Sequence, residues 1–131
     1  MLKEKVKNIL LVEDDPFLSN IYKEKLSQAG YKVRNVGAAK GALELIKEEK
    51  PDLILLDIML VGKLNGYVVL EKVKGDKKLQ DIIVIMLSNL SAFKEKMKAK
   101  NLGADNYILK IENTPEEVLN IIIDTFKKKS K

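Results

Sequence analysis

The chain has 131 residues, the length of one domain, and a domain of this size buries well over half of its unfolded surface without disulfides or metal. It contains no cysteine and no histidine, which excludes disulfides, thiolate sites, histidine-based nucleophiles and histidine-ligated zinc. The net charge of +5 comes from lysines near the two ends, so the body of the domain is nearly balanced. Because aromatic residues are sparse and no recognition-helix pattern is present, we expect no direct binding of nucleic acid.

Targeting signals are also missing from the sequence. The first residues lack the long apolar core of a signal peptide, and no apolar run approaches membrane-spanning length. We therefore expect a cytoplasmic protein without membrane insertion. No linker or repeat interrupts the chain before a lysine-rich tail that starts near residue 127, so residues 1–131 are expected to form one domain.

The first half of the chain alternates strand and helix signals. Residues 6–12 predict an apolar strand, after which Asp15 and Pro16 suit the N-cap and first position of a helix that ends at Gly30. Residues 31–36 predict a second, shorter strand. The buried stripe of the next helix, which closes at Lys50-Pro51, consists of Ala39, Ala42, Leu43 and Ile46.

Residues 53–56 are a continuous apolar run after the turn at Pro51, which predicts a central strand covered on both faces. Asp57 follows this run at its carboxyl end. In open α/β sheets ligands bind at that edge, so Asp57 is a candidate for chemistry, although an aspartate there is also typical of a turn.

The second half continues the alternation. A loop over residues 58–65 has flexible points at Gly62 and Gly66, and a helix then runs to Gly75. Residues 81–87 predict the fourth strand, which ends at Ser88 and Asn89.

Two helices and one strand complete the chain. Leu90, Phe93 and Met97 indicate a helix with a lysine-rich outer surface. Residues 105–109 predict the fifth strand, and Lys110 follows it directly. The last helix opens with the capping box TPEE at residues 114–117, and its expected buried residues are Val118, Leu119, Ile122 and Phe126.

Five strands that alternate with five helices predict an α/β fold with a single doubly wound parallel sheet. In such a sheet the ends of the first, third, fourth and fifth strands lie at one edge. The polar residues that follow these strands are Glu13, Asp14, Asp57, Ser88 and Lys110. Each could be a cap, a turn residue or a solvated lysine, but independent caps would have no reason to fall at four strand ends on one edge.

The convergence of three carboxylates has a chemical consequence. Like charges repel unless a cation is present, so the cluster calls for a divalent ion together with the lysine. Oxygen ligands suit Mg²⁺. Metal and lysine together could bind a phosphoryl group and present Asp57 as its nucleophile.

These residues resemble the receiver domain of two-component response regulators (the CheY-like family) over essentially the whole chain. Residues 11–16 (LVEDDP) are similar to the acidic pair of the family, and residues 55–59 (LLDIM) to its phosphoacceptor motif. Ser88 stands where the family has a switching hydroxyl, and Tyr107 and Lys110 match its rotating aromatic residue and its lysine. The resemblance implies a five-stranded (βα)5 flavodoxin-like sheet with strand order 2-1-3-4-5.

The sequence departs from the family pattern in three places. The loop after the phosphoacceptor lacks the usual proline and is one residue longer before Gly66. Ile111 replaces the proline that usually follows the lysine. Asn89 replaces a small residue beside Ser88.

The resemblance also implies roles for the site residues. Asp57 would be the phosphoacceptor, and Mg²⁺ would be held by Asp14, Asp57 and the backbone carbonyl of Met59, with Glu13 acting through a metal-bound water. Ser88 and Lys110 would bind phosphoryl oxygens.

Ser88 and Tyr107 would pass the phosphorylation state to the face made by the fourth helix, fifth strand and fifth helix. The expected donor is a sensor histidine kinase or a histidine phosphotransfer protein, and the expected output is contact with a downstream protein, since no output domain follows Lys131. The chain would be a monomer or weak homodimer. It would not be an enzyme beyond Mg²⁺-dependent self-phosphorylation and autodephosphorylation.

Three alternatives remain open. A degenerate receiver would act as a protein-interaction module independent of phosphorylation. A haloacid-dehalogenase-type phosphatase would need a second aspartate two residues after Asp57, where Met59 stands. A flavodoxin-like electron carrier would need a phosphate-binding loop after the first strand, where residues 13–15 (EDD) would repel the FMN phosphate.

Overall fold

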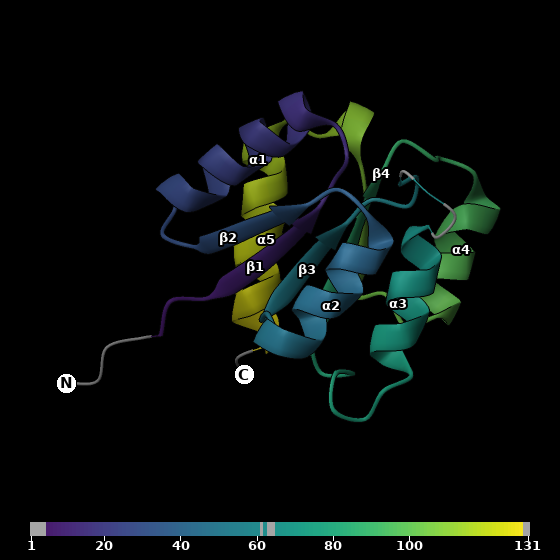
Figure 1. Cartoon of the computed structure of the whole chain (residues 1–131). Helices are drawn as coiled ribbons and strands as arrows, with labels where there is room; N and C mark the ends of the chain where they lie inside the picture. Colours follow the sequence, from purple (N-terminus) through teal and green to yellow (C-terminus); the bar gives the residue numbers. More distant parts are fainter. Residues whose placement is uncertain (1–4, 61, 63–64, 130–131) are drawn as a thin grey trace.

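The computed structural model describes residues 5–60, 62 and 65–129, and it contains one five-stranded parallel sheet (Figure 1). The strands are β1 (Asn8–Val12), β2 (Lys32–Val36), β3 (Leu53–Leu56), β4 (Ile83–Ser88) and β5 (Asn106–Leu109). Their order is β2-β1-β3-β4-β5, and every neighbouring pair is parallel. The predicted doubly wound (βα)5 fold is therefore confirmed.

Within the described ranges, five α-helices connect the strands or follow the last one. They are α1 (Pro16–Gln28), α2 (Ala39–Glu49), α3 (Gly66–Lys74), α4 (Phe93–Asn101) and α5 (Pro115–Lys129). A short 3₁₀ turn, η1 (Lys110–Glu112), lies between β5 and α5. Because the strands are parallel, their carboxyl ends all lie at the same edge of the sheet. The residues that follow β1, β3, β4 and β5 are therefore at this edge.

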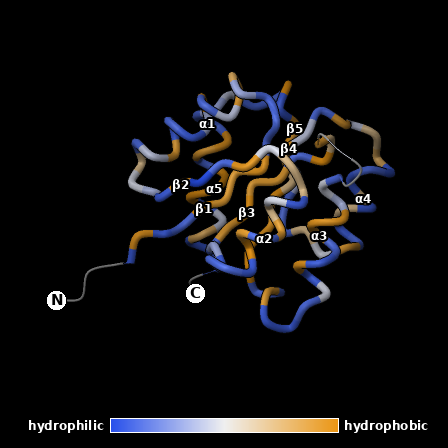
Figure 2. The backbone as a smooth tube through the Cα atoms, viewed as in Figure 1, coloured by the Kyte–Doolittle hydropathy of each residue, from blue (hydrophilic) through white to orange (hydrophobic). Residues whose placement is uncertain are grey.

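The sheet is covered on both faces. Alternate strand residues such as Leu10 and Ile54 pack with α2, α3 and Ala99 of α4, whereas Ile9 and Leu53 pack with α1 and α5. All four residues of β3 are fully buried. Figure 2 shows the result as an apolar band through the central strands with polar residues on the surrounding helices.

The predicted helix caps are present. The Asp15 side chain accepts hydrogen bonds from two backbone N–H groups of α1, with Pro16 at the first position. Gly30 has φ +100° and follows the last turn of α1, where the Tyr31 N–H donates to the Leu26 carbonyl (3.2 Å). Residues 114–117 form the reciprocal capping box, since each end donates a backbone N–H to the side chain of the other (2.9 and 3.1 Å).

Several predicted strand boundaries were wrong by one or two residues. β1 begins at Asn8 rather than at Val6, which is exposed, because pairing with β2 begins at Asn8 and Lys32. For the same reason β2 begins one residue later than predicted. β4 begins at Ile83, where pairing with β3 starts, and includes Ser88, while β5 begins at Asn106. Pairing register, rather than apolar character, decides where these strands start.

The predicted fourth helix is present with its exposed lysines, but two of the three apolar residues that marked it differ from the prediction. Leu90 lies before the helix, and Phe93 at its first position is 75% exposed. Among the described residues of α4, Ala99 is instead the buried one, and it packs in the core cluster on that face of the sheet.

Two predicted segments fall partly outside the described residues. Of the loop over residues 58–65, positions 61, 63 and 64 lie outside them, as do residues 1–4 and the end of the lysine-rich tail at 130–131. The described part of the loop returns to the strand end, since the Gly66 N–H donates to the Ile58 carbonyl (2.8 Å).

Position 66 requires a glycine because the backbone of Asp57 and Ile58 lies very close to it, not because the chain must be flexible there. A Cβ atom at this position would lie 2.1 Å from the Asp57 carbonyl oxygen and 2.8 Å from the Ile58 Cα atom. Both neighbours are backbone atoms at the end of a buried strand, so they cannot move cheaply. The first residue of α3 therefore packs directly against the backbone that carries Asp57.

We predict that Gly66→Ala lowers the free energy of unfolding by about 2 kcal/mol or more, because the added methyl group must displace backbone atoms. Gly37→Ala is the matched control, since its Cβ would meet its nearest atom, the Asp14 Cα, at an ordinary 3.6 Å. Urea unfolding of both variants measures the difference. Equal stability of the two variants would show that the loop does not hold the Asp57 backbone.

Candidate functional site

The Lys110 ammonium group joins the ends of three strands. Its Nζ donates to Glu13 Oε1 at 2.5 Å and to Asp57 Oδ2 at 2.8 Å. The Glu13 and Asp57 residues are only 3% and 7% exposed. Glu13 follows β1, Asp57 follows β3 and Lys110 follows β5, so the sheet topology brings these side chains together as predicted.

The residue after Lys110 does not keep the lysine from the site. Leu109 is buried at the end of β5, directly before η1. Ile111 is exposed, and no peptide bond among the described residues is cis. Lys110 thus reaches Asp57 without the proline that the family usually has at the next position.

Burial and charge change the proton affinities of this group. Burial raises the pKa of Glu13 above its ordinary value, although hydrogen bonds from Lys110 and from the Asp15 N–H oppose that change. Burial alone would lower the pKa of Lys110, but its hydrogen bonds to Asp57 and Glu13 outweigh burial and raise it. Lys110 is therefore firmly held as a cation between the two carboxylates.

A third carboxylate completes an acidic cluster. One oxygen each of Glu13, Asp14 and Asp57 lies within 4.8 Å of the others, and Asp14 is exposed while the other two are buried. This set has only oxygen ligands and an open, solvated side, which fits a divalent cation that keeps some of its water. Such a cation would reduce the repulsion that one lysine only partly balances.

Met59 lies beside the acidic cluster, and its contact with the cluster is made by its backbone N–H group. This N–H donates to Asp57 Oδ1 at 3.3 Å, which orients the carboxylate, while the Met59 side chain is exposed. The role of its carbonyl as a metal ligand stays a prediction.

Ser88 and Tyr107 meet at the loop after β4. Ser88 is 1% exposed, and its hydroxyl accepts a hydrogen bond from the Leu90 N–H (3.2 Å), while the Tyr107 hydroxyl donates to the Leu90 carbonyl (2.6 Å). Burial raises the pKa of Tyr107, and the Ser88 hydroxyl opposes this. Both side chains therefore form hydrogen bonds with the backbone of Leu90. Asn89, which stands between Ser88 and Leu90 in the chain, is exposed.

Two further residues support the site and were not predicted. The Asn35 amide donates to the carbonyls of Leu11 (3.0 Å) and Glu13 (3.3 Å), which fixes the turn after β1. The Tyr67 hydroxyl, one residue after Gly66, donates to the Glu95 carbonyl at 3.2 Å and to the Glu95 carboxylate. An asparagine inside a strand, where it is disfavoured, was the one available signal for Asn35.

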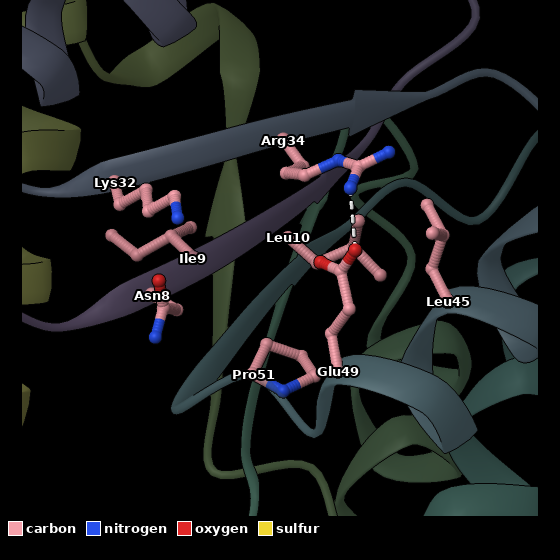
Figure 3. Close-up of a pocket in the computed structure, with 8 residues that line it drawn as sticks. All are labelled: Asn8, Ile9, Leu10, Lys32, Arg34, Leu45, Glu49 and Pro51. Carbon is pink, nitrogen blue, oxygen red and sulfur yellow. Dashed lines mark hydrogen bonds and ion pairs between the residues drawn. The ribbon is translucent and has the colours of Figure 1, made fainter.

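A hollow lies away from this site, at the other end of β1, between β2 and α2 (Figure 3). It is lined by Asn8, Lys32, Pro51 and the ion pair of Arg34 with Glu49. Arg34 and Glu49 satisfy each other here, whereas Lys32, which also lines the hollow, has no ion-pair partner among the described residues. No helix among the described residues is long and apolar enough to cross a membrane.

Comparisons with known proteins agree with this geometry. The family model of the response regulator receiver domain matches residues 9–123. The DNA-binding dual master transcriptional regulator RpaA of Synechocystis sp. is 38% identical over 103 residues, which are 78% of this chain and 42% of RpaA. The chain spans about two fifths of the length of the curated relatives it matches.

Solved structures give the same result. A CheY-like response regulator receiver domain protein from Methanospirillum hungatei superimposes with a TM-score of 0.87 at 28% identity, covering 96% of this chain and 98% of that one. The Mn(2+)-bound form of response regulator Rcp1 gives 0.76 at 26% identity, covering 88% of each chain. The chain therefore belongs to the receiver domains of response regulators, whose general function in two-component signalling is to accept a phosphoryl group.

Proposed function

We propose that this receiver accepts a phosphoryl group on Asp57 from the phosphohistidine of a sensor histidine kinase or histidine phosphotransfer protein. One observation carries the proposal: Asp57 directly follows the central strand, and one of its oxygens is bound by Lys110, beside Glu13 and Asp14. In the transfer, a bond forms between an Asp57 oxygen and phosphorus, and the phosphorus–nitrogen bond breaks. The donor histidine keeps the electron pair of that bond.

The acidic cluster is proposed to hold Mg²⁺. Asp14, Asp57 and the Met59 carbonyl would bind it, with Glu13 acting through water, and the Mn(2+)-bound form of Rcp1 supports a divalent ion in this fold. Bound Mg²⁺ would neutralise negative charge on the phosphoryl oxygens. Lys110, which is already held as a cation, would bind a phosphoryl oxygen in place of the Asp57 carboxylate.

The receiver is proposed to act as a switch that sheds its own phosphoryl group, rather than as an enzyme on a separate substrate. Cytoplasmic location and output by protein contact are part of this proposal. The alternative is a receiver that binds partners without phosphorylation. Lys110 contacts Asp57 although Ile111 replaces the usual proline, and this contact supports a receiver that works by phosphorylation.

We predict that the parent protein gains one phosphoryl group when it is treated with acetyl phosphate and Mg²⁺, and that Asp57→Asn gains none. The amide keeps the shape of the carboxylate but is not a nucleophile. Intact-mass spectrometry measures the addition, and circular dichroism checks that the variant is folded. Equal labelling of both proteins would place the acceptor elsewhere, and no labelling of the folded parent would favour the phosphorylation-independent alternative.

The switch is proposed to run through Leu90. A phosphoryl group on Asp57 offers the Ser88 hydroxyl a charged acceptor, so Ser88 would leave the Leu90 N–H and the loop would move. Tyr107 holds the Leu90 carbonyl and so links the loop to β5. A coupling of about 1–3 kcal/mol, as is typical of such exchanges, shifts a two-state surface without refolding it.

We predict that phosphorylation changes hydrogen exchange mainly over residues 88–110, because the Leu90 loop, α4 and β5 lie there. Ser88→Ala should accept the phosphoryl group yet lose most of this change, and Tyr107→Phe should reduce it by removing the contact with Leu90. Tyr31→Phe removes a hydroxyl on the opposite face of the sheet and serves as the control. Changes confined to the neighbourhood of Asp57 would contradict the switch.

A further inference from the structure

Asp14 differs from the other two carboxylates of the acidic cluster in how its side chain is held. Lys110 binds the carboxylates of Glu13 and Asp57. The Met59 N–H donates to the second of these as well. The Asp14 side chain is exposed and forms no hydrogen bond or ion pair with any residue that the structure describes. The position of its carboxylate therefore depends on the backbone that carries it.

The backbone before Asp14 is held by β2, which lies beside β1 at the edge of the sheet (Figure 1). The Glu13 N–H donates to the Val36 carbonyl at 3.0 Å and so continues the pairing of β1 with β2. Both backbone groups of a strand residue point to the same neighbouring strand, so the Glu13 carbonyl also faces β2. β2 ends at Val36, however, and no backbone N–H of the described residues donates to this carbonyl. The Glu13 carbonyl therefore needs a donor from another source.

The side chain of Asn35 is that donor. Its amide donates to the Glu13 carbonyl at 3.3 Å and to the Leu11 carbonyl at 3.0 Å. The Glu13 carbonyl belongs to the planar peptide group that leads into Asp14, so a hydrogen bond to it fixes the orientation of that group. After Asp14, the Asp15 N–H donates to the Glu13 carboxylate at 3.1 Å, and Asp15 caps α1. Asp14 thus lies between two fixed backbone groups.

These contacts, rather than the packing of the strand, account for the asparagine at position 35. Asn35 is exposed, and asparagine is disfavoured in strands. Its two hydrogen bonds are both made with carbonyls of β1 and of the turn that follows. Because the position is exposed, water could replace the amide as a donor at little cost in stability, but water would not fix the peptide group.

We propose that Asn35 is a positioning residue for the divalent cation, because it fixes the peptide group between Glu13 and Asp14 and thereby the direction of the Asp14 carboxylate. This inference rests on the proposed Mg²⁺ site and adds to it a residue that does not touch the ion. Loss of a contact that orients a metal ligand typically lowers metal affinity by about ten- to a hundredfold. Asn35 therefore controls the affinity for the cation more than the stability of the metal-free fold.

The test replaces the amide by an apolar side chain with similar branching. Asn35→Leu removes both hydrogen bonds without a change of charge, and the exposed position leaves room for the new side chain. Isothermal titration calorimetry should show that this variant binds Mg²⁺ about tenfold more weakly than the parent. Asn106→Leu makes the same substitution at an exposed position at the start of β5, away from the site, and should bind Mg²⁺ as the parent does.

Measurements on the metal-free proteins separate positioning from a loss of stability. Hydrogen exchange at the Glu13 and Asp15 amides should be faster in Asn35→Leu than in the parent, whereas the urea midpoint should stay close to that of Asn106→Leu. A lower urea midpoint with an unchanged Mg²⁺ affinity of the folded variant would show a merely structural role and overturn the inference. Equal Mg²⁺ affinity of folded Asn35→Leu and the parent overturns the inference alone, whereas a parent that binds no Mg²⁺ overturns the proposed metal site as well.

Discussion

The contact of the Lys110 ammonium with Glu13 and Asp57 is the interaction on which the rest of the site depends. It places a positive charge between two buried carboxylates that follow different strands. Without the ammonium, burial of both carboxylates in one small region would be costly, because unpaired buried charges are strongly destabilising. The lysine balances only part of the negative charge, since Asp14 adds a third carboxylate, and this residual charge makes the site suited to a cation.

The fold supplies the rigidity that this arrangement needs. β3 is buried on both faces, and Gly66 lets α3 pack against the Asp57 backbone at a distance that no other residue allows. The next residue, Tyr67, donates a hydrogen bond to Glu95 of α4. Ser88 and Tyr107 form hydrogen bonds with Leu90 in the loop before α4. α4 is thus connected to the site from two sides, although Ala99 is the one residue of the helix that is buried within the described part of the chain.

The sequence was sufficient to predict the fold and the convergence of Glu13, Asp57 and Lys110, because strand ends in a parallel sheet meet at one edge. The sequence was insufficient for features that depend on contacts between elements far apart in the chain, such as strand boundaries and side-chain exposure. Strand starts follow pairing register, as at Asn8 and Ile83, and the way α4 packs on the sheet leaves Phe93 exposed while Ala99 is buried. Apart from the unusual asparagine within β2, no local pattern predicts the contacts of Asn35 and Tyr67 or the close approach at Gly66.

The balance of charge at the strand edge is tested most directly by the affinity of Lys110→Met for Mg²⁺, measured by isothermal titration calorimetry. The ammonium repels a cation at the neighbouring carboxylates, so its removal should tighten Mg²⁺ binding about tenfold relative to the parent. Lys47→Met removes the same charge from an exposed position of α2 and should leave the affinity unchanged. Equal or weaker Mg²⁺ binding by folded Lys110→Met would contradict a site in which lysine and metal share the charge of the three carboxylates.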